Sequence, residues 1–123
     1  MIKHCKNFVT KQELKDLEIY FDNCFFKQKI ARADPMVKGS LSIYSDLVAQ
    51  YFMCIKKPLV EKAFKTKLIP TYSFSRVYFK DNVMKRHSDR ASCEISVSLN
   101  IWSDMQWPLW YETEKGDVPM YTK

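Results

Sequence analysis

One histidine and one aspartate in this chain have a spacing that suits metal binding. His87 and Asp89 stand two residues apart in the stretch MKRHSDRASC. In a β-strand, side chains two apart point to the same face with Cα atoms roughly 6.5 to 7 Å apart, so both could reach one ion. An imidazole and a carboxylate, joined by a second histidine, form the 2-His-1-carboxylate set that holds non-haem Fe(II). The pair therefore predicts half of a metal site.

An ordinary surface strand would explain the same pair. Lys85, Arg86 and Arg90 surround it, as is typical of a solvated strand. A motif with two defined letters also occurs often without function. The only other histidine, His4, precedes the first predicted helix, and we expect it to be a surface residue rather than a ligand.

The composition is that of one folded globular unit. The chain has 123 residues, of which 46% are hydrophobic, 15% are aromatic and only two are glycine, which excludes disordered and collagen-like classes. No apolar run approaches the roughly 20 residues that cross a bilayer, and the first residues lack a secretory pattern. We expect one domain over residues 1–123, a cytoplasmic location and no membrane.

Cysteine usage and charge say little about partners. The four cysteines are widely spaced and form no CxxC pair, so we expect reduced thiols rather than disulfides or a zinc ribbon. The net charge of +6 favours acidic partners in general. It leaves open a basic nucleic-acid-binding module, although we consider nucleic acid the weaker alternative.

The first half, residues 1–69, is expected to be helical support. Thr10 and Glu13 have the spacing of a capping box, followed by apolar residues at helical intervals to about residue 26. A loop is predicted over 32–40 and a second helix over 47–57. Pro58 suits the first turn of a further helix that reaches about residue 67.

Residues 70–123 are expected to supply β-strands. Strands are predicted over 71–79, 84–89, 94–101 and 107–111, with a turn at 80–82. The HxD motif would lie on the second of these strands. Helices followed by antiparallel strands indicate the α+β class, and these few strands leave one sheet edge and one face uncovered.

Three segments in order resemble a known enzyme family. They read LIPTYSFSRVYFKDNVMKRHSD, RASCEISVSLNI and WPLWYE, and the resemblance extends from about residue 59 to residue 111, about two-fifths of the chain. They are similar to a phage and bacterial branch of the Fe(II)- and 2-oxoglutarate-dependent dioxygenases related to prolyl 4-hydroxylases. The resemblance implies the first strands of a double-stranded β-helix (jelly roll), with Fe(II) held by His87 and Asp89. It also implies hydroxylation of a small molecule or a protein side chain such as proline, with 2-oxoglutarate as cosubstrate.

The resemblance also assigns residues to the cosubstrate. In that family a tyrosine on the strand before the motif faces 2-oxoglutarate, and Tyr78 stands nine residues before His87. Tyr78 could instead be a core aromatic, and Arg76 could either bind an acid or pair with Glu94. The intervening turn often carries glycine, and here Asn82 stands in that place because asparagine tolerates a left-handed backbone.

Four further residues have a structural alternative beside a functional one. Asn100 ends a predicted strand, where a turn role and support of the site are equally expected. The tryptophans could line a substrate groove, but packing is the expectation that we prefer. They are Trp102, Trp107 and Trp110.

The sequence departs from the family pattern after the third segment. The family's third ligand is a histidine some tens of residues after HxD, followed by a basic residue that pairs with 2-oxoglutarate, and no histidine follows His87 here. We therefore expect a domain that is incomplete at its C-terminus and a 123-residue chain without turnover. The other function class that remains open is an inactive fold fragment or interaction module.

Overall fold

The first helix begins where the sequence predicts it. The structure is a computed structural model that describes residues 2–121. Helix α1 spans Lys11–Asp22, and a π-helical turn, η1 at Asn23–Lys27, continues it. The Thr10 hydroxyl accepts a hydrogen bond from the Glu13 amide at 3.0 Å, and the Glu13 carboxylate accepts one from the Thr10 amide at 2.9 Å. The predicted capping box is therefore confirmed.

The apolar stripe of α1 and η1 forms the core. Leu17, Phe21 and Phe25 are buried together, and the two phenylalanine rings lie 6.1 Å apart. Partly buried side chains from the strands, from the second helix and from a later loop pack against this cluster. They include Leu41, Ile43, Ala49, Phe52, Val77, Leu99 and Ile101. The stripe of α1 and η1 thus contacts side chains from the sheet, from the second helix and from residues 99–101.

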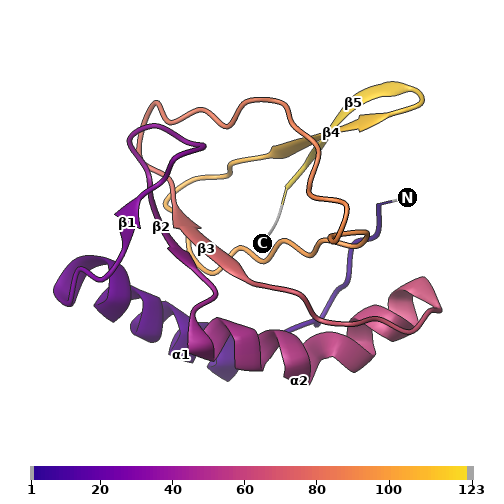
Figure 1. Ribbon diagram of the computed structural model, residues 1–123, viewed down its shortest axis with the longest axis horizontal. Coiled ribbons are helices and arrows are strands. Elements are labelled where there is room, and N and C mark those ends of the chain that lie inside the picture. The colour runs from indigo at the N-terminus through magenta and orange to yellow at the C-terminus, as the bar shows by residue number, and fades with distance from the viewer. Residues whose placement is uncertain (1, 122–123) are drawn as a thin grey trace.

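A small antiparallel sheet lies against the helices. It contains β1 (Arg32–Ala33), β2 (Leu41–Tyr44) and β3 (Phe74–Val77) in the order β1-β2-β3. Leu41 pairs with Val77 and Ile43 with Ser75, so the β2 residues Leu41 and Ile43 share the face that meets the core. The predicted strand over 71–79 is present in shortened form, whereas β2 was not predicted. Figure 1 shows the helices along one side of the sheet.

The second helix is longer than predicted. Helix α2 runs over Leu47–Phe64 and is capped by Asp46, whose carboxylate accepts from the Ala49 amide at 3.0 Å. The prediction of two helices divided at Pro58 is wrong, because Pro58 lies inside α2. A proline inside a helix removes one backbone hydrogen bond and costs about 3 kcal/mol. Pro58 is exposed, so water can solvate the carbonyl that loses its donor.

The turn after β3 forms, but its left-handed residue is not the predicted one. Asp81 has a φ of 68°, and the Asn82 amide donates to the Phe79 carbonyl at 3.1 Å. The Asn82 side chain accepts from the Phe79 amide and donates to the Lys38 carbonyl. Asparagine is used here for its hydrogen bonds, and the expectation of a left-handed Asn82 is wrong.

Residues 84–101 differ most from the prediction. They contain no strand, although strands were predicted over 84–89 and 94–101. Leu99 and Ile101 still pack on the core, while Val97 is 53% exposed. The alternation of apolar residues thus correctly indicated Leu99 and Ile101 as core-facing but not Val97, and a strand also requires a hydrogen-bonded neighbour.

A separate hairpin ends the described part of the chain. Strands β4 (Leu109–Thr113) and β5 (Gly116–Met120) pair in antiparallel fashion, and Gly116 takes a φ of 107° at the turn. β4 corresponds to the short strand predicted at 107–111, shifted by two residues. The mixture of helices with small antiparallel sheets confirms the α+β class. Neither described helix is both long enough and apolar enough to cross a membrane.

Candidate functional site

His87 and Asp89 face each other, although neither belongs to a strand. The His87 Nε2 atom lies 3.6 Å from the Asp89 Oδ1 atom. The two side chains are 33% and 51% exposed, so a solvated ion could reach them. The expectation that a strand presents the pair is wrong, but the two side chains still come together as predicted.

One nitrogen of His87 and one oxygen of Asp89 are hydrogen-bonded elsewhere, and the remaining atoms, Nε2 and Oδ1, face each other. His87 Nδ1 lies 2.9 Å from the Lys85 carbonyl oxygen, which can only accept, so Nδ1 donates; in the neutral form of the ring this assigns the lone pair to Nε2. The Ser96 hydroxyl donates to Asp89 Oδ2 at 2.7 Å. Histidine ligands commonly donate their second N–H to a carbonyl in this way.

These distances allow the pair to hold a metal ion. Ligand bonds of about 2.1 Å with a tetrahedral or cis octahedral angle separate two ligand atoms by roughly 3.0 to 3.4 Å. The observed 3.6 Å requires only a small approach of two exposed side chains. An imidazole nitrogen and a carboxylate oxygen are ligand types that several divalent ions accept, Fe(II) among them, although no group of three or more metal-ligating side chains exists among residues 2–121.

The hairpin contacts the residue that precedes His87. Arg86 donates to Glu112 at 2.8 Å and to Asp117 at 2.5 Å, and these two carboxylates belong to one cross-strand pair of β4 and β5. The two carboxylates raise the pKa of Arg86 above its ordinary value. All three side chains are largely exposed, so these two ion pairs contribute little to the stability of the fold. Their effect is to hold the residues beside His87 against the hairpin.

The other side of the motif contacts Tyr72, just before β3. The Arg90 guanidinium lies 5.3 Å from the centre of the Tyr72 ring. A hydrogen bond with Cys93 is the largest cause that raises the pKa of Tyr72, and the charge of Asp89 adds to it. The motif thus lies at the Tyr72 end of β3.

The two residues predicted for the cosubstrate form a network of their own. Arg76 Nε donates to Asp34 Oδ2 at 2.7 Å, and Arg76 Nη1 donates to the Tyr78 hydroxyl at 3.1 Å. The partner of Arg76 is therefore Asp34 rather than Glu94. Burial alone would raise the pKa of Asp34, but hydrogen bonds from Arg76, Val37 and Met36 hold it below its ordinary value.

The Tyr78 hydroxyl can donate a hydrogen bond to a further partner. Its oxygen accepts from Arg76, so its own O–H remains able to donate. Its ring lies 5.5 Å from that of Trp107, which is a packing contact of the kind expected for the tryptophans. Tyr78 lies just after β3 and Tyr72 just before it, so the cosubstrate pair and the motif contact opposite ends of this strand.

Several residues important to this arrangement were not singled out in the sequence. Asp34 anchors Arg76, and Ser96 holds Asp89. Asp34 also accepts from two amides in an Asp-Pro turn, a local signal that the sequence does contain. Nothing in the spacing of Ser96 from Asp89 indicates their contact.

The remaining predicted residues play simpler parts. Asn100 donates to the Ser103 hydroxyl at 3.0 Å, as in a turn. Trp102 and Trp110 are 65% and 63% exposed. His4 is exposed, as expected.

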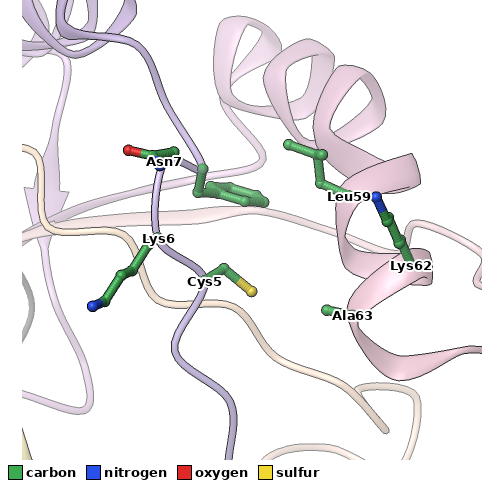
Figure 2. A pocket seen from close by; sticks show the side chains of 7 residues that line it. Cys5, Lys6, Asn7, Leu59, Lys62 and Ala63 are labelled. Carbon is green, nitrogen blue, oxygen red and sulfur yellow. The ribbon is translucent and has the colours of Figure 1, made fainter.

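A shallow hollow is lined by none of the residues predicted for the site. It has a volume of about 320 Å³ and lies between residues 5–8 and the end of α2. Figure 2 shows the Cys5 thiol directed toward Ala63, while Lys6 and Asn7 point away from the helix. The hollow presents no pair of acid and base groups.

Comparison with protein-family models, with curated proteins and with solved structures finds no match to this chain.

Proposed function

We propose that this chain carries the metal-binding motif of an Fe(II)- and 2-oxoglutarate-dependent dioxygenase, with His87 and Asp89 as two ligands. The observation that supports the proposal most strongly is the pair of atoms His87 Nε2 and Asp89 Oδ1, 3.6 Å apart. The other polar atom of each side chain is occupied, by Lys85 and by Ser96. The order of the three sequence segments supports the same reading.

The chain's own residues have separable roles in this proposal. Lys85 selects the histidine tautomer, and Ser96 turns the carboxylate toward the histidine. The resemblance assigns to Tyr78 a hydrogen bond to a carboxylate of 2-oxoglutarate, with Arg76 orienting the Tyr78 hydroxyl beside Asp34. Because Tyr78 and the motif contact opposite ends of β3, this role would require residues 84–96 to lie closer to Tyr78 than they do here. The bound metal and cosubstrate would supply the oxidising power that hydroxylates a C–H bond with O₂. The sheet β1-β2-β3 would belong to a jelly roll.

The proposal predicts weak binding by the 123 residues. The resemblance implies a third histidine ligand, and no histidine follows His87 in this sequence. Two protein ligands leave the ion largely hydrated, so we expect measurable affinity without turnover of 2-oxoglutarate.

The first test measures Mn(II) affinity by the relaxation of water protons. We expect His87→Ala and Asp89→Ala each to weaken binding at least tenfold, because each removes one of two ligands. His4→Ala is the matched control, since His4 is the other histidine and is exposed. Equal affinity in the wild type and in His87→Ala would refute the proposed site.

The second test concerns the cosubstrate. In the presence of Mn(II), Tyr78→Phe should weaken 2-oxoglutarate binding by about 1.5 to 3 kcal/mol, the value of a hydrogen bond to a charged group. Tyr44→Phe is the control because Tyr44 is 57% exposed and lies at the end of β2. An unchanged affinity in Tyr78→Phe would assign Tyr78 to packing alone.

A further inference from the structure

The outer face of α2 is apolar and uncovered. Leu47, Tyr51, Ile55 and Leu59 follow one another at intervals of four residues, and Val48 lies beside them. Their exposed fractions run from 82% at Leu47 to 38% at Val48. We call these five residues the α2 stripe. A helix with apolar residues on both its inner and outer faces is usually buried on both.

The stripe carries no charge along its length. Between Leu47 and Leu59 the charged residues are Lys56 and Lys57, and both are directed elsewhere. Lys56 pairs with Glu13 at 2.9 Å, and Lys57 pairs with Glu61 at 3.7 Å. An uncharged face is compatible with a copy of itself, whereas a nucleic acid or an acidic peptide would find no cation on it.

The geometry of the stripe points to a second copy of this chain. We propose that two chains associate through antiparallel packing of their α2 helices, with the two-fold axis near the middle of the stripe. Ridges at intervals of four residues interdigitate in the commonest class of helix packing. A two-fold interface uses the same patch on both copies, so a self-compatible patch meets its requirement.

The antiparallel arrangement also joins a protruding side chain to a hollow. It places Leu47 of one copy opposite Leu59 of the other. Leu59 and Ala63 line the hollow of about 320 Å³ beside the N-terminal segment (Figure 2). Leu47, which is 82% exposed, is the side chain positioned to enter it.

Charge favours the antiparallel direction over the parallel one. Lys62, Lys65 and Lys67 gather at the end of α2, and Lys62 borders the hollow described above. In the antiparallel pair these lysines lie at opposite ends, more than a Debye length of about 8 Å apart. In a parallel pair they would lie side by side and repel.

The size of the stripe predicts a weak dimer. With roughly 100 to 200 Å² for a complete aliphatic or tyrosine side chain, the stripe exposes on the order of 450 Å² per copy. A pair would bury about 900 Å², which belongs to the weak and transient class of interfaces. We therefore expect a dissociation constant of about 1 to 100 µM.

Sedimentation equilibrium of the 123-residue chain from about 1 µM to about 1 mM tests the proposal. We expect a monomer–dimer equilibrium that persists at high salt. Leu47→Lys and Ile55→Lys should each weaken the dimer at least tenfold while far-UV circular dichroism stays that of the wild type. Ile19→Lys is the matched control, because Ile19 is 54% exposed on α1 and should leave the dimer unchanged.

A thiol cross-link gives a second, independent measurement. Cys54 is exposed near the middle of α2, so a short bismaleimide should join the Cys54 thiols of two copies. Cys54→Ser and Leu47→Lys should abolish this product, and Cys93→Ser should preserve it. A monomer at every concentration, or a dimer that both stripe variants leave intact, would overturn the proposal.

Discussion

Residues 10–77 and residues 78–121 differ in how their side chains are buried. Every buried residue in the described chain lies between Leu17 and Val60, including the aromatic core and the carboxylate of Asp34. Beyond Val60 the described side chains are at most partly buried, and the ion pairs of Arg86 are exposed. The metal pair lies in this second region.

This contrast separates stability from the proposed chemistry. The first region contains the buried apolar surface that drives folding. The second region holds His87 and Asp89 through hydrogen bonds and the hairpin, with little burial. Substitutions in the first region should therefore change stability, and those around the motif should change metal affinity alone.

The largest expected effect is on the core. Phe25 is 4% exposed, so Phe25→Ala should lower the free energy of unfolding by about 4 kcal/mol through lost burial and a cavity. Trp102→Ala, in the second region, removes a larger side chain, but this side chain is 65% exposed. The substitution should therefore change the free energy of unfolding by less than about 0.5 kcal/mol. Urea denaturation measures both. Similar losses would show that the second region has a core of its own.

The next effect concerns the buried ion pair. Asp34→Asn should lower the free energy of unfolding by about 3 kcal/mol at neutral pH, because it leaves the Arg76 charge without its carboxylate. Asp104→Asn, an exposed change of the same chemistry, is the control.

The same pair predicts a pH dependence. Hydrogen bonds hold the pKa of Asp34 below its ordinary value of 3.8 in the folded protein. The stabilisation is therefore complete above that value and is lost as the pH falls through the lowered pKa. The difference between wild type and Asp34→Asn should shrink below about pH 4. A difference that stays constant down to pH 2 would contradict this account.

A smaller effect is expected around the motif. Ser96→Ala removes the hydroxyl that orients Asp89 and should weaken Mn(II) binding roughly tenfold, with the melting temperature unchanged. Ser98→Ala is the control two residues away. A loss of stability without a change in affinity would assign Ser96 to the fold.

The smallest effect is at the start of α1. Thr10→Ala should lower the free energy of unfolding by about 1 kcal/mol, because the Glu13 amide loses its acceptor. Thr10→Ser keeps the hydroxyl and should retain most of this stability. The wild type, Thr10→Ala and Thr10→Ser should bind Mn(II) with the same affinity. A different affinity in either variant would show that the two regions are coupled.

The sequence predicts the first region better because its signals are local. The capping box of Thr10 and the stripe through Phe25 depend on residues three or four apart, and both are confirmed. The prediction placed a helix boundary at Pro58, which lies inside α2. The free-energy cost of a proline inside a helix depends on whether water can solvate the carbonyl that loses its donor, and the sequence does not show this. The short strand β2 was missed, although Leu41 and Ile43 alternate as a strand requires.

The second region depends on distant partners that spacing does not reveal. Residues 94–101 alternate as a strand does, yet the described residues supply no hydrogen-bonded neighbour for them. Arg86 pairs with Glu112 and Asp117, which lie 26 and 31 positions later in the chain. For the site, the sequence correctly predicts that His87 and Asp89 come together, whereas their role as ligands stays a prediction.

The most direct test of the separation between the two regions is to locate a bound metal ion by NMR. Substoichiometric Mn(II) added to uniformly ¹⁵N-labelled protein should broaden the amide signals of residues 85–96. The signals of α1 should stay sharp. In His87→Ala the selective broadening should disappear. Broadening centred on His4 or on the carboxylates of the hairpin, or the same pattern in His87→Ala, would contradict a metal site at His87 and Asp89.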